Sequence, residues 1–423
     1  MSSLPPRARL GVLAVAVALL LGGGVYLVFI RGGDDGPVLE AGSRFGSDAE
    51  GGGGGALLDT LAPVLGARQQ ARAGGPDPAP PTAEEVTRAM GDAVAGVFIV
   101  GLPGTQPRGS FFERLGARPY GGVLLTRHNY DEPSQLAGLT AQIQKVARDA
   151  GHPAPIVTAR QEGDEFSAFA NLAPRGQADV GAGKVADIRA SALAAGQQLR
   201  VLGVGMNLAP NADVAVSGGP GQGRAFADSA SKVVRAVKAS VAGYRRTGVA
   251  PAVGPFPGDG AASQDPESGP APVGLGLEDL RGSDMTPFAA VASGRGAAPA
   301  VQMSNAIYVA YDSVTPATLL PDAVKELRDR LGFEGTIISA DLVATTATTG
   351  GRVGEAAVAA MTAGVDMLVV PGGRAQQDEA YRAVVAAVAS GTISTDRIVS
   401  ALRRIAALRR LTRDAREPMR IDG

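Results

Sequence analysis

Eight short runs of apolar, mostly β-branched residues alternate with longer helix-forming segments, and this alternation is what most constrains the fold. The runs are Val97–Val100, Gly122–Thr126, Ile156–Ala159, Val204–Leu208, Val249–Val253, Ala300–Ser304, Thr336–Ser339 and Met367–Val370. Short apolar runs separated by helical segments are typical of parallel βα units. Eight units in about 330 residues predict an α/β fold, a TIM-type (β/α)₈ barrel with insertions. A doubly wound sheet is the alternative, but no Gly-x-Gly-x-x-Gly follows the first run.

Helix-forming segments rich in Ala, Leu and Arg separate most of these runs. They are Pro133–Ala150, Asp179–Leu202, Ala225–Thr247, Pro321–Leu331 and Gly354–Ala363. A last helix is expected over Thr395–Thr412, with Ile398, Leu402, Ile405 and Leu408 on one face. The arginines of this helix lie mostly opposite that apolar face. We interpret them as a solvated face and not as a binding patch.

An apolar segment of about 20 residues, long enough to cross a bilayer, runs from Leu10 to Ile30. A cleaved signal peptide is the alternative, but the run ends in bulky residues without an Ala-x-Ala site. The segment is therefore expected to be an uncleaved transmembrane signal anchor. Arg7 and Arg9 precede it and Arg31 follows it, so residues 1–9 are expected in the cytoplasm and the rest outside. This predicts a single-pass cell-membrane protein with an extracytoplasmic barrel.

The domain boundaries follow from shifts in composition. Residues 31–81 contain the five-glycine run Gly51–Gly55 and the proline-rich stretch Pro76–Pro81, which favour a flexible linker. The barrel is expected over 82–415, and 416–423 is expected to be a C-terminal tail.

Composition excludes several classes of function. The 40 basic and 41 acidic residues give a net charge of -1, so nothing favours nucleic acid as a partner. The chain has no cysteine, which excludes disulfides, thiolate catalysis and cysteine-zinc sites. Two histidines leave little room for a histidine metal site, and we expect neither a metal nor a cofactor.

A series of short motifs at the ends of the predicted strands carries a family resemblance. In chain order they are Gly121–Leu125 with Asn129, Pro133–Leu136, Gln161–Gly163, Gly205–Pro210 with Asp213, Arg224–Phe226, Phe256–Gly258, Pro316–Leu319 and Leu331–Gly335. Their order and spacing over about residues 97–413 resemble glycoside hydrolase family 3, in particular the single-domain bacterial β-N-acetylglucosaminidases that trim cell-wall fragments. The resemblance implies a barrel whose site lies at the C-terminal strand ends.

The catalytic positions implied by the resemblance are substituted. The family uses a retaining mechanism with an aspartate nucleophile and a separate proton donor. The nucleophile position is Ala340, and the histidine acid/base of this subgroup corresponds to Glu267. Asp341 and Asp265 are fallback carboxylates. Asp341 is expected to point away from the pocket because strand side chains alternate between faces. Glu267 could still donate a proton if its pKa were raised.

The resemblance also identifies sugar-binding positions. A Lys-His pair is replaced by Gly254 and Pro255, and an aspartate by Arg160. An arginine is replaced by Ala168 and a histidine by Asn305. The family residues that remain are Glu162, Asn207, Asp213 and Arg224. Arg160, Asn305 and these four are the candidate ligand-binding set. Asn207 and Asp213 stand on strand-end turns, where a structural role competes equally with ligand binding.

Three hypotheses follow from this pattern. The favoured one is a membrane-tethered, catalytically inactive protein that binds a cell-wall glycan, such as a muropeptide, or an envelope protein. The second is an active β-N-acetylhexosaminidase-like glycosidase in which Asp259, Asp265, Glu267 or Asp341 has taken over the chemistry. The third is an envelope scaffold whose outer helices make the contacts.

Overall fold

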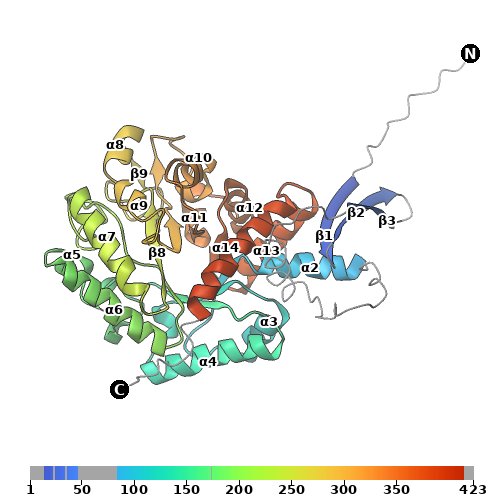
Figure 1. Ribbon diagram of the computed structural model, residues 1–423, viewed down its shortest axis with the longest axis horizontal. Helices are drawn as coiled ribbons and strands as arrows, with labels where there is room; N and C mark the ends of the chain where they lie inside the picture. Colours follow the sequence, from blue (N-terminus) through green and yellow to red (C-terminus); the bar gives the residue numbers. More distant parts are fainter. Residues whose placement is uncertain (1–13, 22–23, 34–35, 46–82, 173, 414–423) are drawn as a thin grey trace, which may run out of the picture.

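The computed structural model describes residues 14–21, 24–33, 36–45, 83–172 and 174–413, and its centre is a closed barrel of eight parallel strands (Figure 1). The strands are β4 (Phe98–Gly101), β5 (Gly122–Leu125), β6 (Ile156–Ala159), β7 (Met206–Asn207), β8 (Ala250–Phe256), β10 (Ala300–Met303), β12 (Thr336–Asp341) and β13 (Met367–Val370). They follow one another in chain order, and β13 pairs with β4 to close the ring. The TIM-type barrel is confirmed, and each expected run contributes one strand.

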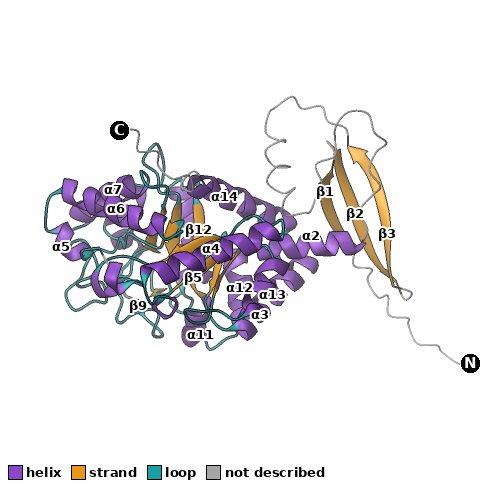
Figure 2. Ribbon diagram, turned by 90° about the horizontal axis from the view of Figure 1, so that it is seen from below, coloured by secondary structure: helices purple, strands orange, loops and turns teal. Residues whose placement is uncertain are grey.

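Helices surround the barrel on its outside (Figure 2). The longer ones are α2 (Ala83–Ala95), α3 (Gly109–Ala117), α4 (Pro133–Asp149), α6 (Val185–Val201), α7 (Ala230–Tyr244), α11 (Leu342–Thr349), α12 (Val353–Ala363), α13 (Arg374–Ala389) and α14 (Thr395–Arg413). Shorter ones are α5 (Gln177–Gly181), α8 (Leu277–Gly282), α9 (Thr286–Ala289) and α10 (Pro321–Lys325), which continues as a π-helical turn over Glu326–Arg330. A two-stranded sheet of β9 (Pro272–Val273) and β11 (Ile307–Tyr308) lies in the loops after β8 and β10.

The barrel strands are buried along their length because helices cover the outside and side chains fill the inside. All four residues of β4, of β5 and of β13 are buried, for example. Strands that are covered on both faces appear in the sequence as continuous apolar runs. This explains why the runs were recognisable in the sequence.

Asp366, just before β13, is a fully buried carboxylate that fixes the last helix to the barrel. It pairs with Arg397 at 2.9 Å and Arg404 at 3.2 Å, both on α14, and with Arg328 at 2.5 Å. Burial lowers the pKa of Arg328 to about 10, against the attraction of Asp366. The expectation that the arginines of the last helix form a solvated face is therefore wrong for Arg397 and Arg404, because a buried carboxylate lies within their reach.

The N-terminal segment differs from its expected helix. In the structure Ala14–Leu21 (β1), Gly24–Gly33 (β2) and Gly36–Phe45 (β3) form an antiparallel sheet. The segment is rich in valine and carries glycine at 22, 23 and 24, a composition that disfavours a continuous helix. Across the described parts of the chain, no helix is both long and apolar enough to cross a membrane. The expected cytoplasmic end, most of the linker and the tail lie outside the described residues.

Candidate functional site

A cavity of about 830 Å³ opens at the C-terminal ends of the barrel strands. Its lining includes Leu125 at the end of β5, Leu208 after β7 and Pro371 after β13. We call this cavity the outer chamber. Beneath it lies an inner chamber of about 30 Å³, lined in part by Ala340. Space of this size accommodates about two water molecules. The cavity therefore lies at the C-terminal end of the strands, where TIM-type barrels have their active sites.

Ala340, near the end of β12, lines the inner chamber and is 4% exposed. Its backbone N–H donates to the Thr318 hydroxyl at 3.1 Å. The only side-chain atom it presents is a methyl group, which can neither attack a carbon nor carry a covalent sugar. The position that the sequence comparison marks for a nucleophile is thus inside the site and chemically inert.

Asp341 lines the outer chamber, which corrects the expectation that it points away from the pocket. It ends β12 and is also the N-cap of α11, so strand alternation no longer applies there. Its carboxylate accepts from the N–H groups of Val343 at 2.7 Å and Ala344 at 3.1 Å. Burial raises the pKa of Asp341 to about 6. The Oδ1 atom, which accepts both bonds, caps the helix.

Glu267 and Arg160 form an ion pair across the site, with Nη2 and Oε1 3.1 Å apart. The positive charge of Arg160 lowers the pKa of Glu267 below its usual value. A proton donor needs the opposite shift, so the raised pKa that an acid role for Glu267 requires is absent. Asp265, which lines both chambers, accepts the Glu267 backbone N–H at 3.0 Å.

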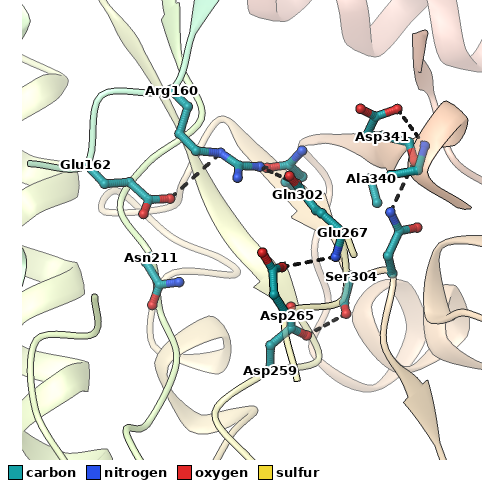
Figure 3. Close-up of polar contacts among 12 residues, drawn as sticks. Arg160, Glu162, Asn211, Asp259, Asp265, Glu267, Gln302, Ser304, Ala340 and Asp341 are labelled. Atoms are coloured by element: carbon teal, nitrogen blue, oxygen red, sulfur yellow. Dashed lines mark hydrogen bonds and ion pairs between the residues drawn. The ribbon is translucent and has the colours of Figure 1, made fainter. Parts of the chain in front are cut away.

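Arg160 spans the site from the end of β6. Figure 3 shows its guanidinium extended between Glu162 on one side and Gln302 and Glu267 on the other. It lies 3.9 Å from the Glu162 carboxylate and 3.5 Å from the Gln302 side-chain oxygen. The positive charge of Arg160 is therefore balanced by residues of this chain.

Gln302 occupies the space beside Gly254. A Cβ added at Gly254 would lie 2.9 Å from the Gln302 Cβ and 3.0 Å from its carbonyl oxygen. A lysine there cannot be accommodated without moving β10. Gly254 thus leaves room for Gln302 in the pocket wall, and Gln302 was not identified from the sequence because a lone glutamine within a strand carries no motif.

Glu162 and Arg224 form a bidentate ion pair at 2.5 and 2.7 Å. The Glu162 side chain is 4% exposed and that of Arg224 20%. Burial alone lowers the pKa of Arg224, but the charge and hydrogen bonds of Glu162 outweigh it and raise the pKa. The two residues brace the loops after β6 and β7, and both line the inner chamber.

Two buried aspartates form a hydrogen-bonded cluster in the chamber wall. Asp259 accepts from the hydroxyls of Ser304 at 2.5 Å and Tyr308 at 2.8 Å, and its N–H donates to Asp213 at 2.6 Å. Asn211 donates to the other Asp213 oxygen at 2.8 Å. Burial, followed by the charge of Asp213, raises the pKa of Asp259 to about 7, and burial raises that of Asp213. Asn211, Ser304 and Tyr308 were missed because contacts between distant loops leave no sequence pattern.

Asn207 and Asn305 have structural partners. Asn207 is fully buried, accepts the Gln161 N–H at 2.8 Å, and donates to the Gln161 carbonyl at 3.0 Å and the Tyr244 hydroxyl at 2.9 Å. Asn305 donates to the Asp341 carbonyl at 3.1 Å and accepts from the Thr345 hydroxyl at 2.6 Å. These contacts leave Asn207 no free group for a ligand.

The described residues contain no group of three or more His, Asp or Glu side chains that could hold a metal ion. The arrangement can bind polar groups through Asp265, Gln302 and the two guanidinium groups. Asp259, whose pKa is raised to about 7 by burial and by the charge of Asp213, is partly protonated near neutral pH.

The chain is similar in sequence to proteins named as glycosyl hydrolases. Residues 100–408 match the glycosyl hydrolase family 3 N terminal domain. It is 31% identical over 290 residues to a beta-hexosaminidase of Alkalilimnicola ehrlichii, covering 65% of this chain and 80% of that one. It is 29% identical over 319 residues to an uncharacterized secreted glycosyl hydrolase of Arthroderma benhamiae, covering 72% and 89%.

Solved structures agree with this similarity. A glycoside hydrolase family 3 beta-N-acetylglucosaminidase from Paenibacillus superposes with a TM-score of 0.71 at 29% identity, covering 76% of this chain and 62% of that one. A beta-N-acetylhexosaminidase from Beutenbergia cavernae gives 0.69 at 25% identity, with 76% and 98% covered. Fold, strand-end site and sequence together establish that this chain belongs to glycosyl hydrolase family 3.

Proposed function

We propose that this chain binds a carbohydrate in its strand-end cavity without hydrolysing it. The observation that carries the proposal is Ala340, which lines the inner chamber at the position where the family mechanism requires a carboxylate. Removing such a group from a catalytic set costs several orders of magnitude in rate. The cavity itself is retained.

The carboxylates around Ala340 already have other partners. Asp341 caps α11, and Glu267 is held ionised by Arg160. Glu162 is paired with Arg224. A nucleophile must be free to approach the anomeric carbon, and these contacts oppose such movement of Glu267, Glu162 and the capping Asp341. This supports a binding role over a hydrolase with relocated groups.

The ligand class follows from the relatives. The similar proteins are named beta-hexosaminidase and beta-N-acetylglucosaminidase. A glycan containing N-acetylglucosamine, such as a cell-wall fragment, is therefore the proposed ligand. Isothermal titration with N,N'-diacetylchitobiose and with a muropeptide tests binding. Heat of binding without product release, checked by chromatography of the same samples, supports the proposal, whereas release of N-acetylglucosamine contradicts it.

A second candidate function rests on Asp259. Its pKa of about 7 keeps part of the population protonated at neutral pH, and it lines both chambers. These are the properties of a general acid. An active glycosidase of this kind would lose its turnover in Asp259→Asn. A rate that is unchanged in that variant excludes Asp259 as the acid.

We also propose that the barrel is displayed outside the cell membrane. The support is the apolar run from Leu10 to Ile30 with its basic N-terminal flank. Membrane fractionation followed by protease treatment of intact spheroplasts tests this: the barrel is expected in the membrane fraction and digested from outside. Pull-down of one envelope protein by wild type and pocket variants alike would favour the scaffold hypothesis instead.

A further inference from the structure

The ion pair between Arg160 and Glu267 lies where the two chambers of the cavity meet. Both residues line the outer and the inner chamber, as Asp265 and Gln302 also do, so the pair forms part of the boundary between them. Arg160 reaches this place from the end of β6 and Glu267 from the loop after β8, and Gln302 of β10 meets the same guanidinium at 3.5 Å. Three segments of the barrel thus converge on one side chain.

The inner chamber is too small for a sugar while this contact holds. Its roughly 30 Å³ suits about two water molecules, whereas a pyranose ring with its substituents has more than ten non-hydrogen atoms. The Arg160 guanidinium is matched by Glu267 and lies 3.9 Å from Glu162. The Arg160 and Glu267 side chains are 30% and 44% exposed, so withdrawing Arg160 would separate a partly solvated ion pair.

The outer chamber has the size and the surfaces that a carbohydrate needs. Its volume of about 830 Å³ falls in the range of small-molecule sites. The half-buried ring of Phe166 lines it, with the Arg224 guanidinium 5.8 Å from the ring centre. Ser263, Gln264 and Asp265, from the loop after β8, supply exposed polar groups to the lining of the same chamber. An aromatic face beside hydroxyl, amide and carboxylate groups fits the apolar face and hydroxyl edge of a pyranose.

The charges of the lining disfavour an anionic ligand. Arg160 and Arg224 are each paired with a glutamate of this chain. Arg127 and Glu165 also line the outer chamber, are both exposed and have opposite sign. The lining further includes Asp213, Asp259, Asp265 and Asp341, so it offers no excess of positive charge to a ligand.

We propose that the Arg160–Glu267 ion pair closes the inner chamber and that a neutral amino-sugar oligosaccharide is held in the outer chamber, with Phe166 as its stacking surface. This inference rests on the proposed binding function and states where in the cavity the ligand lies. It makes Phe166 a positioning residue for the ligand and Arg160 a residue that excludes the sugar from the space above Ala340.

The test combines titration with a crystal soak, both using N,N'-diacetylchitobiose. Phe166→Ala is expected to weaken binding roughly three- to tenfold, as loss of one aromatic contact does. The matched control is Phe112→Ala on α3, a similarly half-buried ring that does not line the cavity, and it is expected to leave the affinity unchanged. In wild-type crystals, sugar density is expected beside Phe166 and not beside Ala340.

Removing the Arg160 side chain is expected to let the sugar enter the inner chamber. In Arg160→Ala, density should extend into the enlarged inner chamber and reach Ala340. Glu267→Ala breaks the same contact from an exposed loop, and it serves if the first variant folds poorly. Wild-type density above Ala340, or an unchanged affinity in Phe166→Ala, overturns the inference while leaving binding established. Absence of binding by the wild-type protein overturns the proposed function and the inference with it.

Discussion

The ion pair between Glu162 and Arg224 gives the sharpest test of which site residues hold the barrel together. Glu162→Leu removes the carboxylate that both guanidinium nitrogens contact at 2.5 and 2.7 Å. The Arg224 side chain is only 20% exposed, and it then loses its direct partner and keeps only the weaker attraction of Asp213 and Glu267. Breaking one side of such a pair costs about 3–5 kcal/mol of unfolding free energy.

The size of the thermal shift follows from the size of the domain. An unfolding entropy of about 2.1 cal/mol/K per residue over roughly 330 residues gives about 0.7 kcal/mol/K. The loss therefore lowers the midpoint by about 4–7 °C in a thermal melt followed by circular dichroism. Arg224→Leu is also expected to lower the midpoint, because the buried Glu162 carboxylate then keeps only the Arg160 guanidinium, 3.9 Å away, as a partner.

The double variant Glu162→Leu/Arg224→Leu shows whether the loss of stability comes from an unpaired buried charge or from altered side-chain packing. Once both charges are gone, no unpaired ion remains, so the double variant is expected to melt above either single variant. If the two losses simply add, the pair is not coupled and the structural role assigned to it is wrong. A pair that instead served the ligand would show normal melting in all three variants and lost sugar binding.

Three further outcomes are expected. Asn207→Ala should lower the thermal midpoint, because it leaves the Tyr244 hydroxyl and the Gln161 backbone N–H without their hydrogen bonds to this side chain. Each buried polar group left unpaired costs about 1–3 kcal/mol of unfolding free energy. Asn171→Ala, at an exposed position, should leave the midpoint unchanged. The raised pKa of Asp259, about 7, means that the folded state keeps a proton that the unfolded chain releases near pH 4. This group therefore makes stability fall as pH rises from about 4 to 7, and urea melts of Asp259→Asn should show a flatter pH dependence in that window. Asp366→Asn should cost about 3 kcal/mol or more in the same melts, since Arg397 and Arg328 lose a fully buried partner; unchanged melts would contradict its anchoring role.

The barrel was predictable because its strands are buried on both faces. Continuous apolar runs such as Met367–Val370 mark such strands, and the alternation with helices sets their parallel order. The same logic failed at the N-terminus, where length and apolarity favoured a helix over 10–30 and the structure has strands. Apolar content alone does not distinguish the two, whereas the valines favour strands and the glycines at 22–24 disfavour a continuous helix.

The site was predictable at the level of residue positions but not of contacts. Strand-end motifs brought Arg160, Glu267 and Ala340 to one cavity. They did not show that Arg160 lowers the pKa of Glu267, since that depends on where the loop after β8 folds. Asp341 was misplaced because a strand's last residue can be the first cap of a helix, and the alternation rule then ends.

The central claim is that the family's hydrolytic mechanism is lost while a carbohydrate site is kept. Its most direct test measures both properties on one preparation: release of nitrophenol from 4-nitrophenyl N-acetyl-β-glucosaminide, and calorimetric binding of N,N'-diacetylchitobiose. The account predicts saturable binding with nitrophenol release no faster than in buffer. Steady, repeated turnover by the pure protein, lost in Asp259→Asn or Asp341→Asn, would contradict it.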